Sequence, residues 1–205
     1  MPLPSFLMFD DFVANPHELR RQALGLGYEA ANASGNYPGI TSARALPIKG
    51  IDDYVSRVTG LKLTGAPGTL HGHCRLTLKG DRGKSGVHID PAAYSGILYL
   101  TPPEHCRGGT DFYIHKRTGT DRVPRTADEL AATGYATYDD FKQDVMDRDE
   151  LDRSAWELTT SIGMRFNRLA LIQPQYWHTS GAGFGSTAQD GRLVYLLFFR
   201  RRNAG

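Results

Sequence analysis

The chain has little cysteine, little excess charge of either sign and no long apolar run. Its two cysteines, Cys74 and Cys106, are too few for a disulfide framework and form no CxxC pair, which favours a reducing compartment. Its 24 basic and 22 acidic side chains leave a net charge of +2, which indicates neither a nucleic-acid nor a membrane-surface partner. No apolar run approaches the roughly 18 residues of a membrane span, and the start lacks the basic region of a secretory signal. We therefore expect a cytoplasmic protein.

The composition is that of one folded domain. Of the 205 residues, 40% are hydrophobic and 22% charged, so the chain can bury a core without disulfides and is not a disordered chain. We predict a single domain over residues 1–205. It comprises an α/β front end over 1–68 and a β-rich core over 69–200, into which a helical segment over 116–160 is inserted.

The front end begins with a predicted strand and a predicted helix. Residues 6–12 form a strand-like run. Asn15-Pro16 then opens a helix, in which Asn15 caps the first turn and Glu18 reaches back to the cap. Gly25 ends this helix.

A loop and a second helix complete the front end. Residues 28–48 are rich in Asn, Ser, Gly and Pro and lack periodicity, which predicts a loop. Apolar residues then recur at one-turn spacing from Ile51 to Val58, which predicts an amphipathic helix.

Five runs of strand length follow. They cover residues 71–78, 96–101, 110–115, 168–173 and 192–199. Each is rich in β-forming residues and bounded by Gly, Pro or Asp. The last run is apolar on both faces, so we expect it inside a packed pair of sheets. Short strands without crossover helices between them predict a mainly β fold of the sandwich, barrel or jelly-roll type.

A polar segment over residues 116–160 interrupts these strands. Residues 126–129 (Thr-Ala-Asp-Glu) match a helix capping box, and Phe141, Val145 and Met146 mark one face of a helix. We interpret the segment as a helical insertion. The sequence leaves open whether it covers a site or is a surface excursion.

The residues that indicate chemistry are His88-Ile-Asp90 and, far downstream, His178. On an extended segment, residues i and i+2 point to the same side, so His88 and Asp90 present an imidazole and a carboxylate to one ion. A third ligand, His178, follows a later strand. Two histidines and one carboxylate form the facial triad of non-haem Fe(II) oxygenases, which leaves positions open on the metal.

The order of motifs carries more information than the triad alone. After HxD come a strand that contains Tyr99-Leu100, a Gly-Gly-x-x-x-Tyr strand from residue 108, the dipeptide Trp177-His178 and Arg192. Over about residues 70–200 the chain resembles the 2-oxoglutarate/Fe(II)-dependent dioxygenases, specifically their prolyl-4-hydroxylase-like branch. The resemblance implies a double-stranded β-helix, or jelly-roll, core with flanking N-terminal helices.

The resemblance also implies roles for individual residues. His88, Asp90 and His178 would ligate Fe(II), and Arg192 would bind the distal carboxylate of 2-oxoglutarate. A buried carboxylate needs a charge partner, which a guanidinium supplies with fixed geometry. Tyr99 is a weaker candidate for the 2-oxoglutarate site, because the family's tyrosine aligns nearer Leu98; a packed strand aromatic is its other interpretation.

Two further features bear on the implied reaction. Halogenating relatives replace the HxD acid with Gly or Ala, so Asp90 implies hydroxylation or a related C–H oxidation, with O2 as oxidant and succinate and CO2 as co-products. Arg192 follows His178 by 14 positions, more than is usual in the family. The extra residues include the Gly-rich run 181–187, which we expect at the substrate opening.

Other interpretations of the sequence remain. The pair His71 and His73 has the HxH spacing of cupin metal sites, but no acid follows at the right distance. A metal-binding jelly roll that senses a small ligand without turnover is the alternative to an enzyme. The second arginine motif of nucleic-acid demethylases is absent. The resemblance to small stand-alone bacterial members implies an amino acid, a peptide or another small molecule as substrate. Its identity, the reaction subtype and the oligomeric state stay open.

Overall fold

The structure, a computed structural model, describes residues 5–29 and 35–202. The beginning of the chain and part of the predicted loop 28–48 lie outside these ranges. In the described part, no helix combines the length and the apolar character needed to cross a lipid bilayer.

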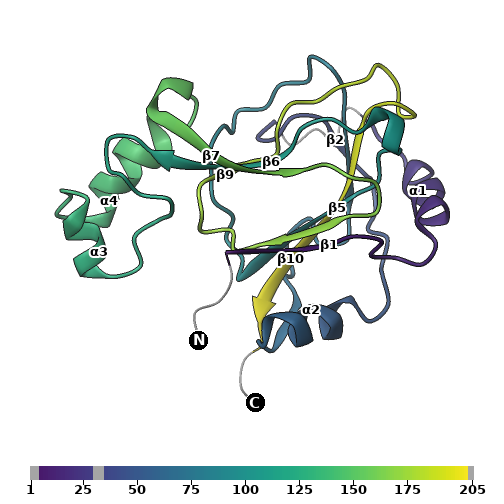
Figure 1. Cartoon of the computed structure of the whole chain (residues 1–205), viewed down its shortest axis with the longest axis horizontal. Coiled ribbons are helices and arrows are strands. Elements are labelled where there is room, and N and C mark those ends of the chain that lie inside the picture. The colour runs from purple at the N-terminus through teal and green to yellow at the C-terminus, as the bar shows by residue number, and fades with distance from the viewer. Residues whose placement is uncertain (1–4, 30–34, 203–205) are drawn as a thin grey trace.

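Two antiparallel sheets form the body of the molecule (Figure 1). Over the described ranges the larger sheet has seven strands in the order β1-β8-β5-β10-β4-β2, with β3 also paired to β10. Its strands are β1 (Phe6–Phe9), β2 (Ile40–Thr41), β3 (Leu63–Gly65), β4 (Cys74–Thr77), β5 (Tyr94–Tyr99), β8 (Leu169–Ile172) and β10 (Arg192–Arg201). The smaller sheet has the order β7-β6-β9, from β6 (Gly109–His115), β7 (Trp156–Gly163) and β9 (His178–Thr179).

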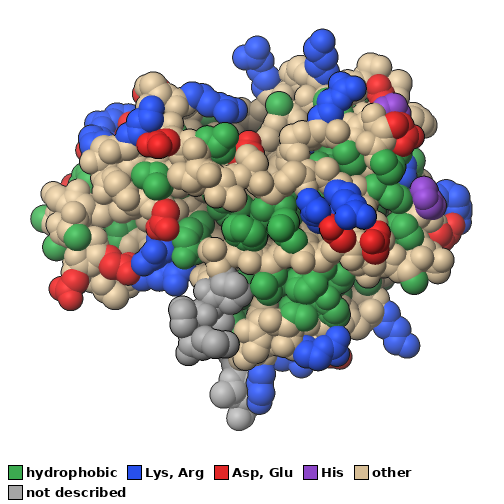
Figure 2. Space-filling view, in the orientation of Figure 1, with side chains coloured by type: hydrophobic (Ala, Val, Ile, Leu, Met, Phe, Trp, Pro, Cys, Tyr) green, Lys and Arg blue, Asp and Glu red, His purple; other side chains and the backbone are tan. Residues whose placement is uncertain are grey.

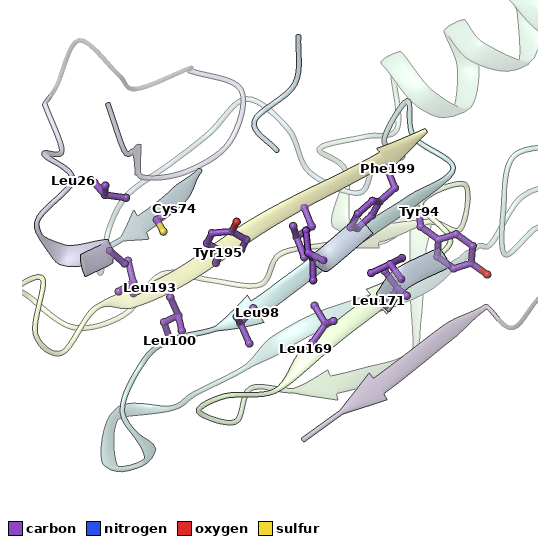
Figure 3. Packing of buried hydrophobic residues seen from close by; sticks show 14 of the residues in the cluster. Leu26, Cys74, Tyr94, Leu98, Leu100, Leu169, Leu171, Leu193, Tyr195 and Phe199 are labelled. Carbon is purple, nitrogen blue, oxygen red and sulfur yellow. The ribbon is translucent and has the colours of Figure 1, made fainter. Parts of the chain in front are cut away.

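The larger sheet is covered on both faces. Successive side chains of β10 point alternately to one face and to the other. Leu193, Tyr195 and Leu197 pack in one cluster with residues of the front-end helices. Figure 3 shows Leu193 and Tyr195 of this cluster on β10. Val194 and Leu196 point the other way and pack with residues of the smaller sheet. The expectation that β10 lies inside a pair of sheets is therefore wrong for one face, which helices cover.

The helices of the front end agree with their sequence signals in extent. They are α1 (Pro16–Leu24) and α2 (Ile51–Thr59). The predicted cap of α1 is wrong, because the Asn15 side chain makes no capping hydrogen bond and Glu18 instead accepts hydrogen bonds from Arg21 and Gln22. Within the predicted loop, β2 pairs with β4, so this segment is partly strand.

The predicted strands are found with shifted ends, and β3, β7 and β9 were not predicted as strands. The run predicted over 71–78 is shorter as β4, and the run predicted over 6–12 is shorter as β1. The longest of the missed strands, β7, starts at Trp156, inside the segment predicted as a helical insertion. It lies at the edge of the smaller sheet with most side chains exposed, so it has no alternating apolar pattern to reveal it.

Part of the remaining segment is helical. It contains α3 (Ala127–Ala132), α4 (Tyr138–Phe141), a π-helical turn η3 (Lys142–Asp147) and a 3-10 turn η4 (Arg153–Ala155), whereas residues 116–126 form turns and isolated bridges. A further 3-10 turn, η2 (Pro103–His105), precedes β6. Thr126 Oγ1 accepts a hydrogen bond from the amide of Glu129, as a capping box requires. The reciprocal bond differs, because the Glu129 carboxylate accepts from the amide of Arg125.

A third apolar cluster joins the insertion to the sheets. Phe141 and Val145 are buried there against Trp156 and Trp177. The helices α3 and α4 project from one end of the smaller sheet (Figure 1). On the face shown in Figure 2, basic and acidic side chains lie beside one another, without a continuous field of one sign.

Candidate metal centre

Three side chains far apart in the sequence meet where the HxD segment crosses β9. His88 and His178 pair as in an antiparallel bridge: each backbone amide donates to the other residue's carbonyl, at 3.0 and 3.1 Å. The amide of Asp90 donates to the carbonyl of Pro174 at 3.1 Å, a second backbone contact between the HxD segment and the chain before β9. This pairing brings the side chain of His178 beside those of His88 and Asp90.

The ligand atoms of the three side chains form one compact group. One donor atom from each residue lies within 4.8 Å of the other two. Nε2 of His88 is 3.7 Å from Oδ1 of Asp90, and Nε2 of His178 is 3.5 Å from Oδ2. Among the described residues this is the group of histidine, cysteine and acidic side chains placed to hold a metal ion. The donor set fits a first-row divalent ion such as Fe(II).

Backbone carbonyls determine which ring nitrogen each histidine offers. Nδ1 of His88 donates to the carbonyl of Gly86 at 2.9 Å, and Nδ1 of His178 donates to that of Tyr176 at 2.8 Å. A carbonyl oxygen only accepts, so each Nδ1 carries a proton, and Nε2 is the ring atom that lies near Asp90 and that each histidine offers to an ion. This arrangement orients imidazole ligands in metal sites, so the local geometry fits a bound ion.

Burial and mutual charge set the protonation of the group. Burial and the neighbouring His178 lower the pKa of His88 to about 4, which keeps its imidazole neutral near pH 7. Burial opposes ionisation of Asp90, but hydrogen bonding and charge from His178 outweigh it and hold the pKa of Asp90 at about 2. Asp90 in turn raises the pKa of His178 against the effect of burial.

Two cavities reach this group. An inner cavity of about 80 Å³ between the sheets is lined by all three side chains, and an outer cavity of about 320 Å³ reaches His88. Tyr37, His88 and Ser180 line both, so the two cavities adjoin at these residues. Residues 181–183 of the Gly-rich run line the outer cavity, where the sequence predicted an opening.

Arg192 lies inside the protein. Its side chain starts from the face of β10 that looks toward the smaller sheet, and the residue is only 3% exposed. One amino group donates to the carbonyl of Gly109 at 3.2 Å, but Nε has no hydrogen-bond partner, and no carboxylate of a described residue lies within ion-pair distance. Burial lowers its pKa, as expected for a cation without a counter-charge.

Tyr99 lies next to this cation. The guanidinium carbon of Arg192 is 5.8 Å from the centre of the Tyr99 ring, and the Tyr99 hydroxyl shares a 2.8 Å hydrogen bond with Thr110 Oγ1. Leu98, on the opposite face of β5, packs in the cluster with the helices. Tyr99 therefore lies beside Arg192, whereas Leu98 points to the other face of the sheet.

The structure keeps the other histidines of interest apart from the metal group. Nδ1 of His71 bonds the backbone of Phe198, and Nδ1 of His73 contacts the carbonyl of Ser42. His115 is buried against Asp149. Both cysteines are free thiols.

The inner-cavity residues that the sequence did not predict include Tyr37, Arg75 and Ser95. Arg75 carried a misleading signal, because it alternates with Cys74 and Leu76, and such alternation is typical of a polar side chain that faces solvent. Tyr37 carried none, since it lies in a loop without periodicity.

The comparisons with known proteins bear on family and fold. A family model described as a family of unknown function (DUF6445) matches residues 4–199. A comparison with curated protein sequences gives no match.

Among solved structures, similar folds occur in non-haem 2-oxoglutarate-dependent proteins. HygX from Streptomyces hygroscopicus, solved with nickel, 2-oxoglutarate and hygromycin B, is 10% identical with a TM-score of 0.56; the match covers 97% of this chain and 84% of HygX. SnoN, a non-haem α-ketoglutarate-dependent epimerase from nogalamycin biosynthesis, is 12% identical with a TM-score of 0.51, covering 96% and 78%. At these identities the likeness establishes the fold.

Proposed function

The chain belongs to the family of unknown function DUF6445, and we propose that it is a non-haem Fe(II)- and 2-oxoglutarate-dependent oxygenase built on a double-stranded β-helix core. Two observations carry the proposal: the buried Arg192, whose Nε lacks a partner, and the His-Asp-His group. Thr110 connects them, because it lines the inner cavity and bonds the hydroxyl of Tyr99, the ring that lies against Arg192. A metal group alone is also compatible with a structural or sensory site. A buried cation without a counter-charge indicates a missing anion.

Each residue then has a defined task. His88, Asp90 and His178 hold Fe(II) through two Nε2 atoms and a carboxylate, leaving positions for other ligands. Arg192 binds the distal carboxylate of 2-oxoglutarate, as the resemblance to the prolyl-4-hydroxylase-like branch implies. Tyr99 packs against the guanidinium and limits where it can move. When bound, the iron and the keto acid supply the oxidising chemistry.

The expected overall reaction is oxidation of a substrate C–H bond. With 2-oxoglutarate and O2 it gives hydroxylated product, succinate and CO2, so that one oxygen atom enters the product and the other enters succinate. The protein's contribution is to orient the reactants and exclude water. Ile97, Leu196 and Phe198 give the inner cavity its apolar wall. An amino acid, a peptide or another small molecule that enters through the outer cavity is the proposed substrate.

The test measures metal binding, 2-oxoglutarate binding and turnover separately. Anaerobic titration of Fe(II) and then 2-oxoglutarate should raise the melting temperature stepwise and produce a metal-to-ligand charge-transfer band. In air, with free amino acids as candidate substrates, succinate should accumulate. His88→Ala, Asp90→Ala and His178→Ala should each lose the band, while His17→Ala, on the exposed side of α1, should retain it.

Three results would change the assignment. If His178→Ala binds iron and turns over normally, the third ligand is wrong. If the wild-type protein binds iron but not 2-oxoglutarate, the oxygenase proposal fails. Binding of both without succinate from any candidate would favour a sensor that keeps the metal site without turnover.

A further inference from the structure

A second buried arginine faces the space between the sheets. Arg75 lies on β4 opposite Val194 of β10, two positions along from the pairing of Thr77 with Arg192. It is 8% exposed. Its guanidinium contacts Thr41 Oγ1 at 3.3 Å and lies 4.9 Å from the centre of the Tyr37 ring. No acidic side chain in the described part of the chain lies within ion-pair distance of it.

The location of Arg75 distinguishes it from Arg192. Arg75 lines the inner cavity together with the three metal-site residues, whereas Arg192 does not line it. The Tyr37 ring on which Arg75 stacks also packs edge-on against His88, with ring centres 4.9 Å apart. Because Tyr37 lines the outer cavity as well, Arg75 lies on the side from which a substrate enters.

The negative charge of 2-oxoglutarate does not neutralise both Arg192 and Arg75. Asp90 is the acidic side chain that lines the inner cavity in the described residues. The charges of a divalent ion, Asp90, Arg192 and the two carboxylates of 2-oxoglutarate cancel. The charge of Arg75 remains, because a guanidinium stays protonated in proteins. A buried unpaired charge is costly, so the complete site has room for one more negative charge.

We propose that Arg75 binds the carboxylate of the substrate, so that the enzyme acts on a small monocarboxylic acid with an apolar portion. This inference rests on the proposed oxygenase function. The planar guanidinium matches a carboxylate with two parallel hydrogen bonds. Next to it, Leu70, Ile97 and Leu196 offer apolar contacts for the rest of the molecule. The C–H bond to be oxidised is thereby held beside the metal group.

The first experiment uses the wild-type protein and needs no variant. The Fe(II)–2-oxoglutarate complex is titrated anaerobically, by calorimetry, with the free L-amino acids and simple aliphatic acids, each paired with its primary amide. We expect at least one acid to bind roughly tenfold or more tightly than its amide, because the amide cannot neutralise Arg75. If no acid binds more tightly than its amide, the proposal is overturned.

Variants then test whether Arg75 causes the preference for the acid over its amide. Arg75→Gln should remove the preference for the acid, and Arg75→Lys should restore part of it, because lysine keeps the charge without the planar fork. Arg44→Gln, at an exposed position, should keep the full preference. Melting temperatures identify any variant that fails to fold, in which case the comparison of acid and amide in wild type decides.

The outcomes separate the two proposals. If Arg75→Gln weakens 2-oxoglutarate as strongly as Arg192→Gln does and leaves the preference for acids intact, Arg75 belongs to the 2-oxoglutarate site and this inference is wrong. If wild type binds no 2-oxoglutarate at all, the proposed function itself fails, which is visible before any acid is added.

Discussion

The hydroxyl of Ser95 donates a 2.7 Å hydrogen bond to Oδ2 of Asp90, the oxygen that lies 3.5 Å from Nε2 of His178. Ser95 is the second residue of β5, so the rigid sheet holds the carboxylate in place. A carboxylate held this way has less rotational freedom to lose when it binds an ion. Ser95 therefore positions a ligand without touching the metal.

Replacement of Ser95 by alanine should weaken metal binding by roughly tenfold, within the range known for partners of metal ligands. A competitive chelator titration measures the affinity. Ser161→Ala is a matched control, because Ser161 donates a similar 2.6 Å hydrogen bond to Asp111 at an exposed position away from the site. Equal affinities of Ser95→Ala and wild type would show that the carboxylate is oriented by other contacts.

Arg192→Met should separate stability from ligand binding. The buried guanidinium has an unpartnered Nε, so its removal should leave the unfolding free energy of the ligand-free protein unchanged or slightly increased. The affinity for 2-oxoglutarate should fall by roughly 100-fold. Arg200→Met, at an exposed position of the same strand, is the control for both measurements. Strong destabilisation with unchanged affinity would make Arg192 a structural residue.

The glycine pair Gly109 and Gly163, which face each other across β6 and β7, should respond differently to alanine. A Cβ on Gly109 would lie 1.9 Å from the carbonyl oxygen of Ile162, whereas one on Gly163 meets no atom within 4 Å. Gly109→Ala should therefore cost about 1–3 kcal/mol in chemical denaturation, and Gly163→Ala well under about 1 kcal/mol. A larger loss in Gly163→Ala would contradict the packing of the two strands.

Asp190 should give the loop before β10 a pH dependence. Its carboxylate accepts hydrogen bonds from Thr187 and the amide of Ser186, which lower its pKa to about 2. A carboxyl group whose pKa is depressed in the folded state stabilises that state above its unfolded pKa, near 3.8. This contribution is lost as the pH falls through about 2.

Unfolding of wild type and Asp190→Asn should accordingly differ most above about pH 4 and converge toward pH 2. Denaturant titrations at several pH values measure the difference, and Asp53→Asn, at an exposed position of α2, serves as the control. A difference that grows on acidification has the wrong sign and would contradict the assignment.

The sequence predicted a structural element well where the pattern that specifies it lies within a short stretch of chain. Helix α2 was predicted in full because its apolar spacing is contained in nine residues. Edge strand β7 was missed because exposed side chains remove the alternation on which strand prediction relies. The Asn15 cap was wrong because a capping side chain must also adopt the right rotamer, which residue type does not determine.

The candidate site divides in the same way. HxD on an extended segment is visible without coordinates, and the order of motifs after it supplied His178, Arg192 and Tyr99 as further candidates through the family resemblance. Tyr37 and Arg75 entered the cavity only through the pairing of β2 with β4 and of β4 with β10. Neither pairing has a signature within its own strand.

By itself, the sequence determined which chemical groups are present and which side of each strand they share, because alternation along a strand is a local property of the backbone. The tertiary structure alone decided that His178 pairs with His88, and that two arginines on neighbouring strands face one interior space. Register between strands distant in sequence is set by how the whole core packs, and no short stretch of chain contains that information.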